Sequence, residues 1–336
     1  AKKKVTFADI AAYTNFSKTT ISRYFNNPDS LTLENQEKIA AALEELGYQE
    51  NKLAKVLANG KSEFVGIIIP NLYLHYYSEI LNQLLSSYSK FGYKFLVFVS
   101  NDGREREQQY INELLAYKIE GLIILAHFSF AELAKCNIPI VAIEREAKHI
   151  CSVDTDNYMA DAGNQSSDTK PLDILIHVNV PVPENVPAHN RITAFEDTCQ
   201  KYHVPYELML GDLGSTYETT FDRIKETFET IEEKYPDRKK GIFFANDTYA
   251  NIFLNLIIQK YGHLPEQYVL GFDNSPIANE AIVPITTIGQ QIDKIAETAL
   301  ELLVSQMDEM KKEPTPLKTP VHKQITPVLI HRKTTD

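Results

Sequence analysis

The sequence contains no tryptophan, only three cysteines in 336 residues, and no apolar run long enough to cross a bilayer. Cys136, Cys151 and Cys199 are odd in number and share no metal-ligand spacing, which fits a reducing compartment rather than a disulfide framework. No GxGxxG, HExxH or paired CxxC motif occurs, and the NGKS at residues 59–62 lacks the first glycine of a phosphate loop. With no signal peptide at its start, the sequence predicts a soluble cytoplasmic protein that is not an enzyme and uses no metal or cofactor.

The first fifty residues predict three short helices, the first two of which are joined by a tight turn. The expected N-caps are Thr6, which forms a capping box with Asp9, then Ser17 and Thr32. This spacing is typical of a helix-turn-helix, whose second helix enters the major groove of DNA. An ordinary helical cap on a larger domain is the alternative, but a cap needs neither the short turn nor the basic, hydroxyl-rich face that the second helix would present.

Charge is distributed unevenly along the chain. Residues 1–61 hold nine basic and seven acidic residues, so their net charge is +2, whereas the net charge of the whole chain is -11. An acidic body repels phosphates and leaves the N-terminal end to face DNA.

A short segment around residues 49–61 has Leu53, Ala54 and Leu57 at helical spacing and Gly60 as a terminator. A helix this short is unstable alone, but two copies meeting at a dyad could press Leu57 into the minor groove as an apolar wedge. The alternative is a plain linker whose leucine packs on the body.

Beyond residue 62, apolar strands alternate with amphipathic helices, as at residues 76–91 and 105–117. Such a pattern predicts two lobes with parallel sheets that are covered on both faces. The predicted strands are residues 64–70, 94–100, 121–126, 139–144, 172–178, 206–211, 241–246 and 268–273.

Polar side chains follow several of these strands. They are Asn71 and Tyr73, Asn101 and Asp102, Glu144 and Arg145, Asn246 and Asp247, and Asp273 and Asn274. Ligands of such sheets bind beyond the carboxyl ends of the strands, and carboxylates, amides and guanidinium groups bind vicinal hydroxyls. The set predicts a sugar site, although each residue alone could equally be a helix cap or a solvated loop residue.

The whole chain resembles the LacI/GalR family of transcriptional repressors. The resemblance rests on VTFADIAAYTNFSKTTISRYFNN, EKIAAALEELGYQEN and NKLAKVLANGK, and on VGIIIP, EGLIIL, FFANDTYA, VLGFDNS and ITTIGQ in the body. It implies a homodimer on a near-palindromic operator in double-stranded DNA. It also implies a small effector, a sugar or sugar derivative, between the lobes of a core like that of periplasmic sugar-binding proteins.

The resemblance also implies which residues bind. Lys18, Thr19 and Arg23 fall on base-reading positions and Leu57 on the minor-groove wedge. With their neighbours, the candidate DNA-binding residues are Thr6, Ser17, Lys18, Thr19, Thr20, Ser22, Arg23, Asn26, Asn51, Leu53, Ala54 and Leu57. The candidate effector-binding residues are Tyr73, Tyr76, Tyr77, Asp102, Arg145, Arg191, Asn246, Asp247, Asp273 and Gln290.

The sequence departs from the family pattern at three places. Leu74-His75 replaces the usual Asn-Pro, Glu144 replaces the usual Asp, and residues 161–185 diverge. The chain ends without a leucine-heptad tail, from which we expect a dimer rather than a tetramer.

The predicted organisation has three parts. Residues 1–48 form the helix-turn-helix domain, 49–61 the hinge, and 62–336 the effector-binding and dimerisation core. The first lobe comprises about 62–157 and 291–320, and the second about 158–290 and 321–336. Lobe closure on the effector is expected to form or melt the hinge helices. A cytoplasmic sugar-binding or sugar-processing protein without DNA regulation is the alternative.

Overall fold

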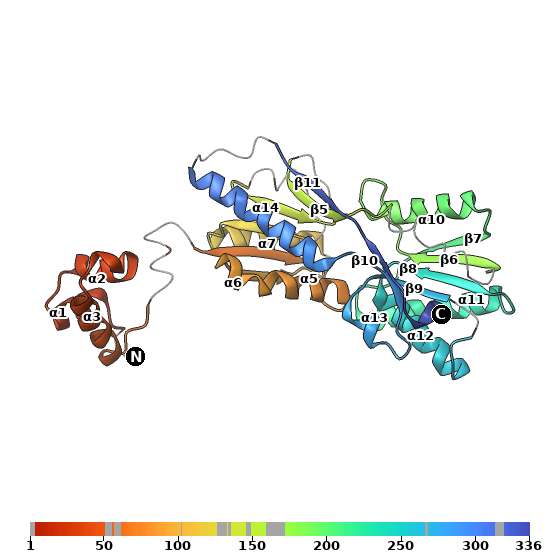
Figure 1. Cartoon of the computed structure of the whole chain (residues 1–336), viewed down its shortest axis with the longest axis horizontal. Helices are drawn as coiled ribbons and strands as arrows, with labels where there is room; N and C mark the ends of the chain where they lie inside the picture. Colours follow the sequence, from red (N-terminus) through yellow and green to blue (C-terminus); the bar gives the residue numbers. More distant parts are fainter. Residues whose placement is uncertain are drawn as a thin grey trace. The chain divides into compact units, whose positions relative to one another are not determined.

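The computed structural model describes residues 4–50, 56, 62–101, 103–125, 133, 136–145, 149–158, 172–265, 268–312 and 319–336. It divides into two compact units, residues 1–61 and 62–336 (Figure 1). The second unit begins at Ser62, the residue predicted as the start of the core. No helix among the described residues is long and apolar enough to span a membrane.

The first unit is a three-helix bundle. Its elements are α1 (Phe7–Thr14), α2 (Lys18–Asn26), the 3-10 turn η1 (Pro28–Ser30) and α3 (Leu33–Glu45). The predicted caps are confirmed, including the capping box at Thr6. One fully buried isoleucine from each α-helix, Ile10, Ile21 and Ile39, meets at the centre of a small core. Because Ile21 points inward from α2, the opposite side of that helix faces solvent.

The second unit contains two six-stranded sheets (Figure 1). The first has the order β11-β5-β4-β3-β1-β2 and the second the order β12-β10-β9-β8-β6-β7. All pairings are parallel except that of β12 with β10. The first sheet comprises β1 (Phe64–Ile69), β2 (Lys94–Val99), β3 (Gly121–Ile124), β4 (Ile140–Ile143), β5 (Cys151–Thr155) and β11 (His322–Ile325). The second comprises β6 (Ile174–Asn179), β7 (Tyr206–Leu210), β8 (Lys240–Phe244), β9 (Tyr268–Asp273), β10 (Thr286–Gly289) and β12 (Val328–Ile330).

Helices cover both faces of each sheet, as the continuous apolar strands predict. Around the first sheet lie α5 (His75–Ser86), α6 (Tyr88–Phe91), α7 (Arg104–Ala116) and α14 (Ile292–Lys312). Around the second lie α10 (His189–Lys201), α11 (Tyr217–Lys234), α12 (Asp247–Tyr261), α13 (Pro276–Glu280) and the 3-10 turn η2 (Lys333–Thr335). Helices α5 and α14 form a hydrophobic core with one face of the first sheet, and α7 forms a second core with the other face. On the second sheet, α11 and α12 pack on one face and α10 packs on the other.

Several predictions of secondary structure were incomplete. Strands β5, β10, β11 and β12 were missed because they are short, and in β5, β10 and β11 polar residues also interrupt the apolar pattern, such as the buried Asp154 in β5. The helix predicted over 76–91 is two helices, α5 and α6. The Ser87 hydroxyl donates to the Leu84 carbonyl at 2.5 Å, a local bond that competes with continuation of the helix.

The predicted return of the chain to the second lobe after residue 320 was wrong. β11 pairs in parallel with β5 of the first sheet, and His322 Nε2 lies 3.0 Å from the buried Asp154 carboxylate. The final crossing therefore lies between β11 and β12. The chain crosses between the sheets three times, after β5, after β10 and after β11.

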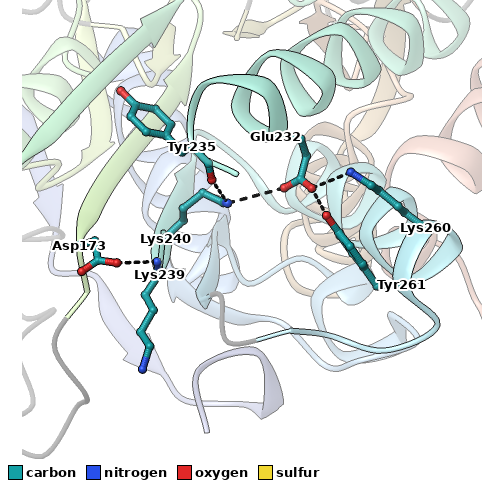
Figure 2. Close-up of polar contacts among 7 residues, drawn as sticks. All are labelled: Asp173, Glu232, Tyr235, Lys239, Lys240, Lys260 and Tyr261. Atoms are coloured by element: carbon teal, nitrogen blue, oxygen red, sulfur yellow. Dashed lines mark hydrogen bonds and ion pairs between the residues drawn. The ribbon is translucent and has the colours of Figure 1, made fainter. Parts of the chain in front are cut away.

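A buried lysine stabilises the amino end of the second sheet (Figure 2). Lys240 begins β8, and its Nζ donates to the Tyr235 carbonyl at 2.5 Å and lies 3.7 Å from Glu232 Oε1. Glu232 also accepts hydrogen bonds from Lys260, at 2.8 Å, and from the Tyr261 hydroxyl. Burial lowers the pKa of Lys240, and the Glu232 carboxylate opposes that shift. The network joins α11, α12 and β8 at the end of the sheet opposite to the polar strand ends.

Candidate functional site

The exposed side of α2 carries the basic and hydroxyl groups that the sequence predicts. Lys18, Thr19 and Arg23 are exposed. Ser17 is also exposed, but its Oγ accepts the Thr20 amide at 3.1 Å as the N-cap, so its first role is to start the helix. Three long or hydroxylated side chains on one face of a short helix can reach base edges and phosphates.

The other candidate DNA-binding residues lie around this face or cannot be placed. Thr6 and Asn26 are exposed, and Thr20 and Ser22 are half-buried. Asn51, Leu53, Ala54 and Leu57 lie outside the described residues, as does the rest of the predicted hinge apart from residues 49, 50 and 56.

A cavity of about 270 Å³ lies between the two sheets of the second unit. Its polar lining comes from the ends of β4, β6, β8, β9 and β10 and from the starts of α5 and α10. These residues are Tyr76, Tyr77, Glu144, Arg145, Asn179, Arg191, Asn246, Asp273 and Gln290. Parallel strands place their carboxyl ends at one edge, which explains why residues so distant in sequence meet here.

Strained backbone occurs at two residues that line the cavity, Glu144 and Asp273, and at the neighbours of two lining residues. Glu144, Asp273, Asn274 and Gln291 have φ values of 57°, 107°, 55° and 57°, in the left-handed region that favours glycine. Each such residue costs roughly 1–3 kcal/mol and persists where the surroundings hold it. The strain clusters where strands end, in agreement with a functional role for these turns.

Arg191 is fixed on three sides. Its Nε donates to Asn157 Oδ1 at 2.7 Å and its Nη1 to the Ala245 carbonyl at 3.0 Å. Its guanidinium carbon lies 3.5 Å from the centre of the Phe272 ring, a stacking distance. The planar group is therefore held rigidly at the cavity wall, with Nη2 as the nitrogen left to bind a ligand.

A hydrogen-bonded chain sets the position of Asp273. Gln290 Nε2 donates to Asp273 Oδ1 at 2.5 Å, and the Thr155 hydroxyl donates to Gln290 Oε1 at 2.6 Å. Burial raises the pKa of Asp273, with a further rise from the Asp247 carboxylate and an opposing effect of Arg191. These two hydrogen bonds fix Asp273 Oδ1, and they thereby also fix the orientation of Oδ2, the other carboxylate oxygen.

Three buried polar atoms on the cavity wall have no hydrogen-bond partner among the described residues. They are the Tyr76 hydroxyl, Glu144 Oε2 and Arg145 Nε. Burial raises the pKa of both Tyr76 and Glu144. Unpartnered buried polar atoms cost free energy, so a polar ligand that binds them would recover it.

The remainder of the cavity wall is aliphatic. It is formed by Leu74, Val180, Pro181, Val182, Pro183, Val186, Ala188 and Ala245, with the Tyr249 ring. A cavity with one apolar wall and one hydrogen-bonding wall suits a small ligand with an apolar face and several hydroxyls.

The structure brings together seven of the ten predicted effector residues: Tyr76, Tyr77, Arg145, Arg191, Asn246, Asp273 and Gln290. Asp102 lies outside the described residues. Tyr73 does not line the cavity, because its hydroxyl reaches Gly214 and Thr220 instead.

Asp247 does not line the cavity either. Its carboxylate accepts the Thr287 hydroxyl at 2.6 Å and, at 2.8 and 3.1 Å, the amide and hydroxyl of Ser275. Burial raises its pKa to about 7, although these hydrogen bonds oppose the shift. Asp247 therefore holds the turn after β9, the strand that ends at Asp273.

Sequence reasoning missed Asn179 and the aliphatic wall. Asn179 directly follows the predicted strand 172–178, so the rule that selected the other strand ends would have found it. The wall at residues 180–188 carried no signal, because proline and valine in a loop indicate no particular ligand.

Two family models match the chain. One, of the lacI family of bacterial regulatory proteins, matches residues 6–51, and one of a periplasmic binding protein-like domain matches residues 174–335. The first match covers the three helices, and the second covers most of the cavity residues.

Named relatives are similar over most of the chain. The ribose operon repressor of Halalkalibacterium halodurans is 24% identical over 307 residues, covering 90% of this chain and 91% of the relative. The sucrose operon repressor of Streptococcus mutans is 26% identical over 310 residues, covering 89% and 92%. Among solved structures, the Lac repressor dimer bound to operator and the anti-inducer ONPF superposes with a TM-score of 0.80 at 21% identity, over 99% of both chains.

Proposed function

The chain belongs to the lacI family of bacterial regulatory proteins, and on this premise we propose that a neutral sugar in its core cavity controls its affinity for operator DNA. The protein is a DNA-binding transcriptional repressor, and the relatives it matches are repressors by name. We propose that it acts in the cytoplasm and that it is not an enzyme. The relatives named for ribose and sucrose operons support a carbohydrate effector.

The proposal of a neutral ligand is based on the balance of charges in the cavity lining. Glu144 and Asp273 are matched by Arg145 and Arg191, so the fully ionised lining has no net charge. Two of its buried atoms, Glu144 Oε2 and Arg145 Nε, lack partners among the described residues and can accept from and donate to the hydroxyls of a neutral ligand. A phosphate would need an excess of positive groups, which this lining does not supply while Glu144 and Asp273 are ionised.

We propose that the repressor acts as a homodimer, with α2 of each copy reading one half of a near-palindromic operator. Lys18, Thr19 and Arg23 would contact bases and phosphates, because they are exposed on α2 and can donate hydrogen bonds. Effector and operator binding are linked, so each changes the affinity for the other by the same factor.

A thermal-shift screen of the full chain against neutral sugars, sugar phosphates and sugar acids tests the effector class. A ligand at about one hundred times its Kd adds about 2.7 kcal/mol to the free energy of unfolding and raises Tm. We expect hits confined to neutral sugars. A sugar phosphate that shifts Tm while neutral sugars do not would refute the neutral-ligand proposal. If the chain binds a sugar but shows no salt-sensitive affinity for DNA, the result would favour the alternative of a sugar-binding or sugar-processing protein without DNA regulation.

Replacing Arg23 with alanine is expected to weaken operator binding by roughly 10- to 100-fold and to relax the preference at one operator position. Arginine reads guanine by two hydrogen bonds, and loss of such a contact costs about 1–3 kcal/mol. Binding-site selection with the purified variant would measure both effects. The control is Lys38→Ala, because Lys38 is exposed on α3 and paired with Glu34. An unchanged sequence preference in the Arg23 variant would remove it from the base-reading set.

A further inference from the structure

The loop between β1 and α5 reaches from the first lobe onto the second. The Tyr73 hydroxyl donates to the Gly214 carbonyl at 3.4 Å, and the Thr220 hydroxyl donates to Tyr73 Oη, also at 3.4 Å. The His75 amide donates to Thr248 Oγ1 at 3.1 Å, and His75 Nδ1 lies 2.9 Å from the same oxygen. The Thr248 hydroxyl has one hydrogen and two lone pairs, so it accepts from the amide and forms a second hydrogen bond with Nδ1, whose direction depends on the histidine tautomer.

An apolar contact accompanies these polar ones. Leu74, between the two, packs against the hydrophobic core of the second lobe formed by α11, α12 and β8. Its amide is held by Asn71 Oδ1 at 3.2 Å, and Asn71 is itself buried. The side chains of three consecutive residues of the first lobe, 73–75, therefore contact the second lobe.

These contacts lie far from the crossings of the chain. The three crossings leave β5, β10 and β11, and these strands are at or next to one edge of their sheets. β1, which precedes the loop, is the fifth of six strands counted from that edge, and Gly214 follows β7, the last strand of the second sheet. A rotation about the crossings would separate residues 73–75 from the second lobe more than it would separate any residues near the crossings.

We propose that residues 73–75 form a clasp that holds the two lobes closed across the mouth of the cavity and that must release for the effector to enter or leave. The inference rests on the proposed function only in taking the cavity as the effector site. The clasp regulates that site, because the apparent Kd of a ligand rises in inverse proportion to the fraction of chains in the binding-competent state. It also couples the first turn of α5, which carries Tyr76 and Tyr77, to the start of α12.

The strength of the clasp can be estimated from its bonds. One net hydrogen bond corresponds to roughly a two- to twelvefold change in an equilibrium. Weakening two of them, by Tyr73→Phe with His75→Ala, is expected to raise the open fraction at least roughly threefold.

Distances between spin labels in the ligand-free full chain test the clasp without knowledge of the effector. Labels would be attached at Glu113→Cys on α7 and Glu229→Cys on α11, both exposed, in a Cys136→Ser background. When the labelled chain is diluted with excess unlabelled chain, so that only distances within one copy of the proposed homodimer contribute, we expect one dominant distance in the parent chain and an added longer distance in the Tyr73→Phe/His75→Ala variant. Tyr73→Phe alone, which removes one oxygen atom, is expected to show the same change to a smaller extent.

The matched control is Tyr117→Phe/His149→Ala, which makes the same chemical changes at exposed residues of the first lobe. Its distances are expected to equal those of the parent. If both clasp variants unfold with an unchanged Tm and give the parent distances, the clasp is refuted. No sugar enters this measurement, so a sugar screen without hits would count against the proposed function and leave the clasp standing.

Discussion

Arg191→Ala is expected to lower the free energy of unfolding of the core by about 3 kcal/mol and to abolish the Tm shift produced by a bound sugar. The variant leaves the Asn157 amide oxygen and the Ala245 carbonyl without their donors, at roughly 1–3 kcal/mol for a buried polar atom. It also removes the stacking on Phe272. The loss of binding follows from Nη2, the nitrogen that we assign to the ligand.

Arg191→Lys separates the two effects. Lysine keeps the charge but cannot donate in the fixed planar geometry or stack in the same way, so we expect a smaller loss of stability and still a large loss of binding. Urea unfolding and calorimetric titration with the sugar identified by the screen would measure the two quantities. Arg223→Ala, at an exposed pair with Glu226, serves as the control and should cost under about 0.5 kcal/mol. A normal titration with Arg191→Ala would exclude Arg191 from the site.

In the variant His177→Phe, the free energy of unfolding is expected to fall less steeply than in the parent chain as the pH is lowered. His177 is fully buried and packs against the rings of Phe195 and Phe243, whose centroids lie 5.2 and 4.8 Å from that of the imidazole. Its Nδ1 lies 3.1 Å from the Phe243 carbonyl and Nε2 lies 3.2 Å from Asn179 Nδ2. The carbonyl can only accept, so Nδ1 carries the hydrogen, Nε2 accepts from the Asn179 amide, and the ring is neutral.

Burial lowers the pKa of His177 to about 3, from an ordinary value of 6.5. The unfolded chain therefore binds a proton at this residue below about pH 6.5 while the folded chain does not. Stability from this group is complete above pH 6.5 and is lost as the pH falls towards 3, at up to roughly 1.4 kcal/mol per pH unit. In the phenylalanine variant this loss is absent.

Urea unfolding of both chains at pH 7, 6 and 5 would measure the difference in slope. Burial shifts the pKa values of Glu144 and Asp273 upward, so these carboxyls favour the folded state in acid in both chains, and their effect cancels in the comparison. The control is His149→Phe, because His149 is exposed. Equal slopes for the parent chain and the His177 variant would show that His177 is protonated in the folded state.

Local patterns in the sequence specified most of the elements and the general place of the site. The capping box at Thr6 and the caps at Ser17 and Thr32 depend on contacts within four residues, and all three are confirmed. Eight strands were predicted because each is an apolar run between turn signals. The strand-end rule selected Arg145, Asn246 and Asp273 because parallel strands bring their carboxyl ends to one edge.

Only the tertiary structure decided which of two neighbouring residues faces the cavity. Asn246 lines the cavity, whereas Asp247, one residue later, turns back to hold Ser275 and Thr287. The pairing of β11 with β5 and the seating of Tyr73 on the second lobe likewise join residues more than 100 positions apart. Hydrophobic periodicity and helix capping depend on residues that are close together in the sequence, so they cannot predict contacts between residues so far apart. The sequence by itself therefore determined the elements and the edge at which the site lies, and packing between the lobes decided which side chains compose it.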